Sequence, residues 1–237
     1  MNKPFHFKQF SISQDRCAMK IGTDGILLGG WANVENNPKS ILDIGAGTGV
    51  IALMLAQRTW AETIDALEID ENAYEQCVEN FENSPWGDRL FCYHAALKEF
   101  VREIDTEYEL IVSNPPFYDA EFLSPEMSRN RARFAVSLPF EELLRGVSNL
   151  LTKKGIFVVI VPKESETVFT DLAMAQKLHL QKRTEVKGNP TSPIKRSLLQ
   201  FGFQQTALES DVLIIEKARH DYTKEYIALT KEFYLKL

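Results

Sequence analysis

Asn114 lies in the stretch Ser113-Asn114-Pro115-Pro116-Phe117, where residue types that can bind a flat polar ligand follow a short apolar run. The two prolines remove backbone donors and fix φ, so neither a strand nor a helix can continue through them. The resulting turn is rigid and leaves an amide and an aromatic ring at the end of the preceding segment. An amide offers both a hydrogen-bond donor and an acceptor, and the ring offers an apolar face. The stretch could therefore hold a nucleobase by its amino group; the alternative is a proline turn with a capping asparagine.

A glycine-rich loop is the second stretch that could do chemistry. Gly45, Gly47 and Gly49 alternate with other residues directly after the apolar run 41–44. Glycines permit positive φ and let a ligand approach the backbone, while the N-terminus of the following helix supplies N–H donors. The dinucleotide fingerprint Gly-x-Gly-x-x-Gly has its third glycine one residue later and binds a pyrophosphate. The strictly alternating loop therefore disfavours a dinucleotide.

Acidic residues beside this loop select the kind of ligand. Asp43 would repel a phosphate but suits a cation or an ammonium group, and S-adenosylmethionine carries both a sulfonium and an amino group. Glu68 ends the next apolar run about 20 residues later, where a carboxylate can accept hydrogen bonds from both ribose hydroxyls. Asp70 follows and is expected to cap the next helix. The loop and the acids together indicate a positively charged nucleoside cofactor.

The segment from Lys20 to Trp31 offers a third polar turn. Thr23 or Asp24 could cap a short helix over residues 25–31, which is the ordinary role of such residues. In the functional interpretation, the backbone donors of the turn hold an anionic group instead. The sequence leaves both interpretations open.

The rest of the chain predicts a scaffold that brings these stretches together. Apolar runs typical of buried strands alternate with helical segments; the expected strands cover residues 41–44, 63–70, 89–94, 108–112 and 156–161. Such an alternation predicts βαβ units and a parallel sheet covered on both faces. Because the carboxyl ends of parallel strands meet at one edge, the glycine loop and Asn114 are expected to lie close together.

The two ends of the chain complete this prediction. Residues 5–12 suggest the short strands of a hairpin, residues 198–203 and 211–217 an antiparallel edge, and residues 222–237 a closing helix. No repeat or linker interrupts the chain, so we expect a single domain over residues 1–237. The fold class is then α/β, with a Rossmann-like, seven-stranded, mostly parallel sheet, helices on both faces and an antiparallel edge strand.

Composition narrows the class of protein further. The 237 residues carry a net charge of -6, with a pI of about 5.4, which argues against indiscriminate binding of nucleic acid but allows a local basic patch. The three cysteines and four histidines are scattered without disulfide or metal-ligand spacing, so no metal is expected. No apolar run approaches the ~20 residues of a membrane span, and the first residues lack the features of a signal peptide. We therefore expect a cytoplasmic protein that binds no membrane.

Three motifs resemble those of a known family. Residues 42–49, Leu-Asp-Ile-Gly-Ala-Gly-Thr-Gly, resemble motif I of the class I S-adenosylmethionine-dependent methyltransferases, and residues 68–70 resemble the acidic motif after their second strand. Residues 114–117 resemble the motif of members that methylate amino groups conjugated to a planar system. The flanking stretches, among them residues 195–196 and 222–226, extend the resemblance to bacterial enzymes that methylate N6 of adenosine 37 in valine tRNA.

The resemblance implies S-adenosylmethionine as the cofactor, tRNA as the substrate and no obligatory protein partner. The cofactor-binding residues that it implies are Thr23, Asp24, Asp43, Gly45, Gly47, Gly49, Glu68, Asp70 and Asn114. It also implies that residues 1–35 form an N-terminal extension that packs near the cofactor. Many members place an acid after the third strand to bind the adenine amino group. Here His94-Ala95-Ala96 stands at that point, which leaves backbone groups or Asp70 for the contact.

For the methyl-accepting group, the resemblance implies that the side-chain oxygen of Asn114 and the carbonyl of Pro115 accept hydrogen bonds from the two N–H groups of the target amino group. An exocyclic amino group is a poor nucleophile because its lone pair is delocalised into the ring. The two acceptors favour a pyramidal nitrogen whose lone pair points at the methyl group, so catalysis is positioning and electrostatics. Phe117 would stack on the base, a contact worth roughly 1–3 kcal/mol.

Basic residues near the expected base pocket could bind the polynucleotide. Arg129, Arg131 and Arg133 follow the proline turn within a long connection at the carboxyl end of the sheet, where arginines can hold phosphates. The alternative is a solvated charged loop. Lys195 and Arg196 follow an expected exposed loop and either extend the basic track or keep a sheet edge soluble.

Two alternative substrates remain for the same chemistry. Ribosomal RNA could supply the adenosine, or a release factor could supply a glutamine side-chain amide. Members that act on protein typically have Tyr at the position of Phe117 and a helical N-terminal domain, so Phe117 and the short aromatic N-terminus favour RNA. A non-catalytic binding module would have no reason to keep Asp43, Glu68 and Asn114 together in register.

Overall fold

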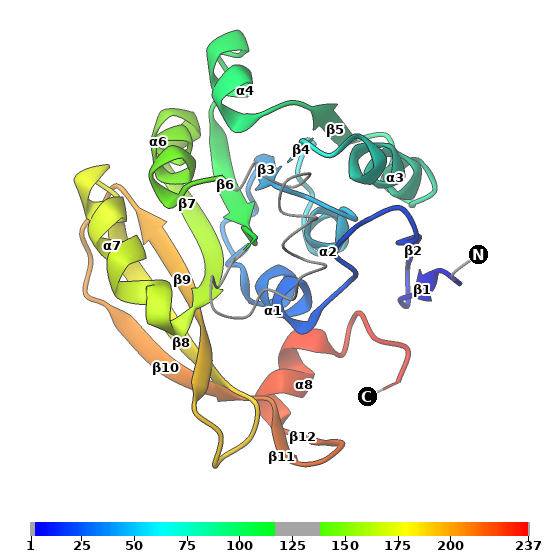
Figure 1. Cartoon of the computed structure of the whole chain (residues 1–237), viewed down its shortest axis with the longest axis vertical. Coiled ribbons are helices and arrows are strands. Elements are labelled where there is room, and N and C mark those ends of the chain that lie inside the picture. The colour runs from blue at the N-terminus through cyan, green and yellow to red at the C-terminus, as the bar shows by residue number, and fades with distance from the viewer. Residues whose placement is uncertain (1–2, 117–137, 237) are drawn as a thin grey trace, which may run out of the picture.

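The computed structural model of the chain describes residues 3–116 and 138–236. Its main sheet, within these residues, has eight strands in the order β10-β8-β9-β7-β6-β3-β4-β5 (Figure 1). These strands are β3 Ser40–Ile44, β4 Thr63–Glu68, β5 Leu90–His94, β6 Tyr108–Ser113, β7 Leu151–Pro162, β8 His179–Lys187, β9 Ile194–Gly202 and β10 Glu209–Ile214. Two small antiparallel pairs accompany the sheet: β1 Phe5–His6 with β2 Ser11–Ile12, and β11 Glu216–Ala218 with β12 Asp221–Tyr222.

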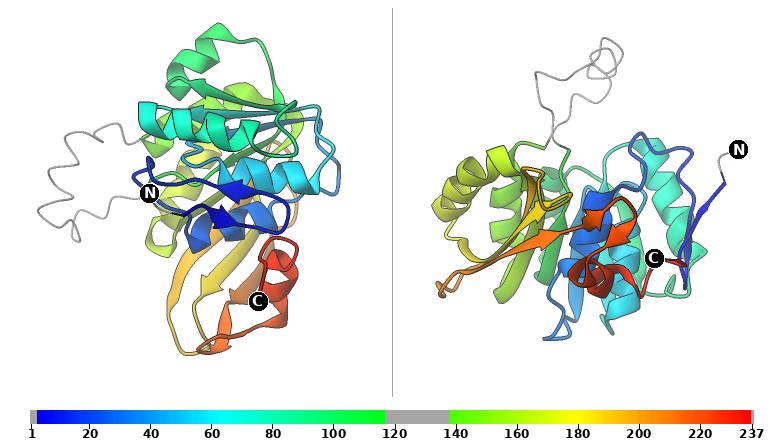
Figure 2. Two further views of the ribbon diagram at one scale, coloured as in Figure 1. Left: turned by 90° about the vertical axis from the view of Figure 1, so that its right-hand side faces the viewer. Right: turned by 90° about the horizontal axis from the view of Figure 1, so that it is seen from below.

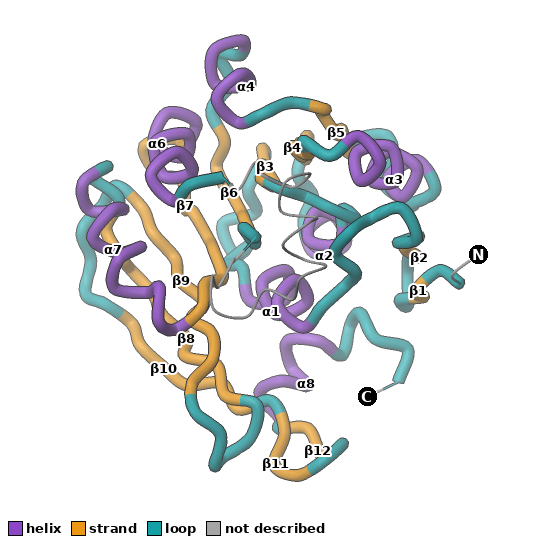
Figure 3. The backbone as a smooth tube through the Cα atoms, in the orientation of Figure 1, coloured by secondary structure: helices purple, strands orange, loops and turns teal. Residues whose placement is uncertain are grey.

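Helices cover both faces of the main sheet (Figure 3). The helices on one face are α1 Thr23–Trp31, α2 Val50–Arg58, α3 Glu71–Glu82 and α8 Lys224–Thr230, whose buried residues join one apolar cluster. Those on the other face are α4 Leu97–Glu103, α6 Phe140–Leu150 and α7 Glu166–Ala175, which the short 3-10 helix η1 Lys163–Ser165 precedes. The alternation of strands and helices in the sequence predicted this layering, and the α/β class is confirmed.

The strand number and the place of the antiparallel strand differ from the prediction. Residues 179–187 form the additional strand β8, whose polar run Gln181-Lys182-Arg183 gives no apolar alternation that would predict it. β9 pairs antiparallel with both β7 and β8, while β10 pairs parallel with β8. Within the described sheet, the antiparallel strand therefore lies inside, and the edge strand β10 is parallel to its neighbour. The edge was assigned wrongly because β8 was missed.

The N-terminal hairpin and the C-terminal segment lie side by side (Figure 2). The predicted hairpin is confirmed by the pairing of Phe5 with Ile12. Phe7 forms a β-bridge with Tyr234, and the Lys8 amide donates to the carbonyl of Phe233 at 2.8 Å. The closing helix α8 is therefore shorter than predicted, because the chain leaves the helix after residue 230 and meets the hairpin.

Helix α1 begins two residues earlier than predicted and lacks the predicted cap. Gly22 is its N-cap and offers no side-chain acceptor, while the Asp24 carboxylate accepts a hydrogen bond from Arg196 at 2.8 Å. The ion pair with a distant strand thus replaces the expected local contact. Asp70 does cap α3 as predicted, since its Oδ1 accepts from the amide of Ala73 at 2.9 Å. Across the described residues, we find no helix with the length and apolar character that a bilayer crossing requires.

Candidate active site

The glycine loop folds over the carboxyl end of β4. Its three glycines all have positive φ, +76° at Gly45, +55° at Gly47 and +79° at Gly49, which side chains rarely adopt. The amides of Gly45 and Ala46 both donate to the carbonyl of Leu67 at 2.9 Å. A Cβ at Gly45 or Gly47 would meet no atom within 4 Å of the described structure. The loop therefore presents an open backbone face that a ligand can approach closely.

Gly49 serves a different purpose from the other two glycines. A Cβ at this position would lie 2.5 Å from Phe81 Cε1 and 2.9 Å from Cys77 Sγ. Both of these side chains belong to the buried face of α3. Gly49 therefore lets α3 pack tightly against the start of α2, whereas Gly45 and Gly47 keep the face of the loop open.

Asp43 lies beneath the loop and is fully buried. Its Oδ2 accepts from the amide of Ala52 in the first turn of α2 at 3.2 Å, and its Oδ1 has no hydrogen-bond partner among the described residues. Burial raises the pKa of this carboxyl to about 7, against the hydrogen bond from Ala52, which lowers the pKa. A buried acceptor without a partner is costly, so a donor or a positive charge brought to the loop would stabilise it.

Glu68 is fixed at the end of β4 by three backbone donors. Its Oε2 accepts from the amide of Gly47 at 2.8 Å, and its Oε1 accepts from the amides of Ile69 and Asp70 at 2.8 and 2.9 Å. The side chain is only half-buried, so its carboxylate keeps access to solvent beside the open face of the loop. Because this carboxylate is already ordered, it can accept further hydrogen bonds from a ligand without an additional loss of side-chain conformational entropy.

Asn114 leaves the sheet next to the glycine loop. Ile44 of β3 pairs with Ser113 of β6, so the following residues, Gly45 and Asn114, emerge side by side from parallel strands that lie about 4.8 Å apart. The buried Ser113 hydroxyl donates to the carbonyl of Ile44 at 2.8 Å and ties the two strand ends together. Asn114 itself is half-buried and is followed by the buried Pro115. The two stretches that the sequence singled out therefore meet at one edge.

The region after β5 carries no acid at the position where many relatives have one. His94 pairs in register with Glu68, its Nε2 lies 3.0 Å from the carbonyl of Ile69, and its ring stacks on Tyr74 at 5.1 Å. The Glu99 carboxylate reaches back to the amide of Ala96 at 3.3 Å. A carboxylate is thus present at the start of α4, although it belongs to the helix rather than to the strand end. The sequence alone did not single out Glu99.

Asn80 is a further residue that the sequence analysis missed. It lies on the buried face of α3 and is 3% exposed. Its Nδ2 donates to the carbonyls of Thr48, in the glycine loop, and of Ser13, both at 2.9 Å, and its Oδ1 accepts from the amide of Ser13 at 2.8 Å. The amide of Arg16 likewise donates to Gln76 on α3 at 2.9 Å. A polar residue on the apolar stripe of a helix is the signal that could have identified this link.

The remaining predicted residues fall into two groups. Thr23 and Asp24 lie with Lys195 and Arg196 around a cleft of about 330 Å³. Phe117, Arg129, Arg131 and Arg133 lie outside the described residues. Within the described ranges, we find no group of three or more His, Cys, Asp or Glu side chains that could hold a metal ion.

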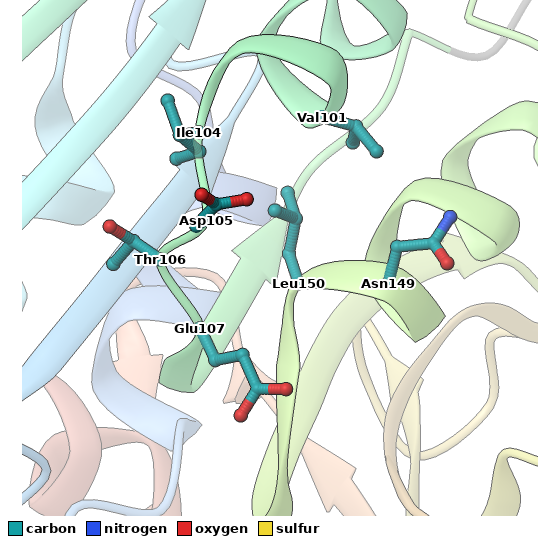
Figure 4. A pocket seen from close by; sticks show the side chains of 7 residues that line it. All are labelled: Val101, Ile104, Asp105, Thr106, Glu107, Asn149 and Leu150. Carbon is teal, nitrogen blue, oxygen red and sulfur yellow. The ribbon is translucent and has the colours of Figure 1, made fainter.

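Another cavity, of about 410 Å³, lies between the end of α4 and the end of α6 (Figure 4). Asp105, Thr106 and Glu107 line it from the segment before β6, and Asn149 and Leu150 line it from α6. Because Glu107 directly precedes β6, this cavity lies at the amino end of a strand whose carboxyl end carries Asn114. None of the predicted site residues contributes to it.

The fold and the site define a class of protein. A mostly parallel sheet with a positive-φ glycine loop and a fixed acid at the end of the next strand is the arrangement of the class I methyltransferases, and the Asn-Pro-Pro turn beside the loop is that of members that methylate amino groups. The methyltransferase small domain family matches residues 27–178, and the chain belongs to this family. S-adenosyl-L-methionine is the methyl donor.

Curated relatives follow the chain over its whole length. The tRNA1(Val) (adenine(37)-N6)-methyltransferase of Flavobacterium johnsoniae is 61% identical over 234 residues, which cover 98% of this chain and 100% of that protein. The protein of the same name from Bacteroides fragilis is 46% identical over 239 residues and is covered, like this chain, to 100%. Among solved structures, a predicted O-methyltransferase from Agrobacterium tumefaciens matches with a TM-score of 0.67 and 19% identity, over 89% of this chain and 96% of its own. At that identity the likeness concerns the fold alone.

Proposed function

We propose that the protein transfers a methyl group from S-adenosylmethionine to the N6 amino group of adenosine 37 in valine tRNA, and that it does so in the cytoplasm. The observation that carries the chemistry is the register of Ile44 with Ser113, which sets the following residues, Gly45 and Asn114, side by side at the ends of adjacent strands. The identity of the substrate is supported by the relatives, which carry this activity in their names and match the chain from end to end.

The residues around the glycine loop suit the cofactor. Gly45 and Gly47 leave room for it against the backbone, Glu68 offers a fixed acceptor for ribose hydroxyls, and the unpartnered oxygen of Asp43 lies beneath the place where a positive charge would come. S-adenosylmethionine supplies an electrophilic methyl group on a sulfonium. Asp43 is fully buried, so we propose that it acts by holding the loop and by its charge rather than by direct contact.

Asn114 and Pro115 would present the adenine amino group. The side-chain oxygen of Asn114 and the carbonyl of Pro115 accept hydrogen bonds from the two N–H groups of the adenine amino group. These contacts favour a pyramidal nitrogen whose lone pair is free to attack the methyl group. The hydrogen bond from Ser113 to Ile44 and the burial of Pro115 hold the backbone of this turn in place before the substrate arrives. The nitrogen loses a proton after transfer and becomes neutral again, so no strong general base is required.

The N-terminal extension, residues 1–35, would form part of the cofactor side of the site. The bridge that Asn80 makes between Ser13 and the carbonyl of Thr48 supports this proposal, because it fixes the extension against the glycine loop. Thr23 and Asp24 remain predicted cofactor ligands. The ion pair of Asp24 with Arg196 also suits Asp24 to hold that arginine in place. Phe117, Arg129, Arg131 and Arg133 stay predicted contacts to the RNA.

The direct test of this mechanism is the variant Asn114→Ala. We expect kcat for methylation of a valine tRNA transcript to fall by about 10²–10³, the usual effect of removing one preorganised hydrogen-bonding group. The dissociation constant for S-adenosylmethionine, measured by calorimetry, should stay near the wild-type value. Asn149→Ala, the same change at the exposed end of α6, is the matched control and should leave kcat unchanged.

The same assay separates the substrates. A transcript with guanosine at position 37 should accept no methyl group if adenosine 37 is the target. Methyl transfer into ribosomal RNA or into a release factor, with none into valine tRNA, would replace the proposed substrate. Full activity of Asn114→Ala would refute the mechanism whatever the substrate.

A further inference from the structure

A cleft of about 330 Å³ lies beside the candidate active site and is built from distant parts of the chain. The first turns of α1, the end of β8 with the residue after it, the start of β9 and the segment after β10 contribute to it; the lining residues are Thr23, Asp24, Leu27, Val186, Gly188, Lys195, Arg196 and Ile215. The lining combines two cations, one acid and an apolar surface.

Strand register places this cleft at the same sheet edge as Asn114. Ser113 pairs with Val159 of β7, and Pro162, the last residue of β7, pairs with Arg196. Arg196 therefore lies two strands across from β6 and two residues further out than Asn114. With the usual strand spacing and rise, the Cα atoms of Asn114 and Arg196 are about 12 Å apart.

The first turn of α1 separates the cleft from the glycine loop. A Cβ on Gly25 would lie 3.3 Å from Val50 Cγ1, so this turn packs against the start of α2. One residue earlier, Asp24 accepts a hydrogen bond from Arg196 Nε at 2.8 Å. The cleft is thus a direct neighbour of the cofactor side of the site, and Asp24 fixes the guanidinium that faces it.

The lining of the cleft suits a nucleotide better than a small polar ligand. Ile215 is half-buried and exposes apolar surface in the cleft, backed by the buried Leu27 and Val186, so a base or a ribose can cover that surface. Lys195 is exposed, and it takes part in none of the ion pairs among residues 3–116 and 138–236. Its ammonium group can therefore bind a phosphate without breaking an ion pair of its own within these ranges.

We propose that this cleft binds the nucleotide next to the target adenosine in the RNA strand. Lys195 contacts its phosphate, Ile215 contacts its base or ribose, and Asp24 is a positioning residue that holds Arg196 toward the RNA. This subsite rests on the proposed function, since it takes RNA as the substrate. This subsite explains how a protein with a negative net charge can bind an anticodon loop, because Lys195 and Arg196 lie where the RNA strand would pass.

The test measures RNA binding and cofactor binding separately. The probe is an anticodon stem-loop of valine tRNA, and the variant Lys195→Ala is compared with Lys154→Ala, which removes an exposed lysine near the amino end of β7. We expect Lys195→Ala to weaken stem-loop binding about tenfold and to lower the salt slope of log K by about 0.7, the value for one phosphate contact to a single strand. Lys154→Ala should change neither quantity.

Stem-loops in which single phosphates are replaced by uncharged methylphosphonates locate the contact. One substitution next to the target adenosine should weaken wild-type binding by the same factor as Lys195→Ala, and it should cause no further loss in that variant. Asp24→Asn should weaken stem-loop binding because it releases Arg196, and Lys195→Ala should leave the dissociation constant for S-adenosylmethionine unchanged.

Two results would overturn the subsite. In the first, Lys195→Ala matches Lys154→Ala in its affinity for the stem-loop and in its salt slope. In the second, Asp24→Asn and Lys195→Ala weaken binding of S-adenosylmethionine rather than of RNA, which would assign the cleft to the cofactor. Methylation of the full valine tRNA by the wild-type protein is measured alongside. Its absence would refute the proposed function and the subsite together, whereas its presence with either result above would refute the subsite alone.

Discussion

Asp43 lies on β3 and Asn114 follows the adjacent strand β6, and their surroundings suit them to different roles. Asp43 is fully buried and braces the first turn of α2 through the amide of Ala52. Asn114 is half-buried at the end of β6, beside the open face of the glycine loop. Asp43 can act on a ligand through the loop and through its charge, whereas Asn114 can touch the ligand directly. The motifs predicted both as site residues but could not separate these roles, because burial depends on the packing of α2.

Asp43 should make the stability of the protein depend on pH. Burial raises the pKa of its carboxyl from 3.8 to about 7, so between these values the folded protein keeps a proton that the unfolded chain has lost. The free energy of unfolding should therefore fall as pH rises from about 4 to about 7, by up to roughly 4 kcal/mol from this group. Asp43→Asn cannot ionise and should remove this slope.

Urea unfolding of the two proteins without cofactor, across the same pH interval, measures this effect. Asp105→Asn, a change at an exposed acid, is the control and should keep the wild-type slope. Parallel pH profiles for the wild type and Asp43→Asn would show that the buried carboxyl carries no such penalty.

At the scale of elements, the glycine loop combines an open face with a closely packed end. Gly45 and Gly47 leave space around their Cα atoms, and Gly49 is in contact with α3. Asn80 joins the same helix to the carbonyl of Thr48, so the loop is fixed from the α3 side and open on the other. This asymmetry predicts different consequences for the same substitution at two positions.

Gly47→Ala should weaken cofactor binding and should cost less stability than Gly49→Ala. Its positive φ costs about 1–2 kcal/mol with an added Cβ, and the methyl group occupies the open face, so affinity for S-adenosylmethionine should fall by about tenfold or more. Gly49→Ala adds a clash with Phe81 and Cys77 and should cost about 3 kcal/mol of stability or more. Denaturant unfolding and calorimetry of both variants measure the contrast; an equal loss of stability in the two would contradict it.

Local signals predicted some elements well and others poorly. The strands before the glycine loop and before Asn114 were predicted because parallel strands buried on both faces are apolar throughout. β8 was missed because its Gln181-Lys182-Arg183 run is polar, and these side chains are only half-buried in the structure. Gly155 lies within β7, where a Cβ would lie 3.0 Å from the carbonyl oxygen of Tyr108. Contacts with a neighbouring strand decide that position, and a local pattern cannot show them.

At the scale of the whole molecule, the added strands β8, β9 and β10 extend the sheet and carry the RNA-facing cleft. Ion pairs join this extension to the core: Glu166, at the start of α7, binds Lys163 at 2.7 Å and Arg183 of β8 at 3.0 Å. The ion pair of Asp24 with Arg196 joins residues 172 positions apart. No local pattern in the sequence indicates that these two residues meet. Arg196 comes close to the start of α1 only because β9 is antiparallel and therefore begins at the carboxyl end of β7. The family motifs predicted the residues of the methyl-transfer site. The cleft could be recognised only in the folded structure, because its residues come from distant parts of the chain.

The most direct measurement of the proposed function is nucleoside mass spectrometry of valine tRNA, purified from cells that have or lack the gene for this protein. We expect N6-methyladenosine at position 37 in the cells with the gene, its loss in the cells without it, and its return with the wild-type protein but not with Asn114→Ala. An unchanged modification in the absence of the gene, or the loss of N6-methyladenosine from ribosomal RNA instead, would contradict the assignment of adenosine 37 in valine tRNA as the target.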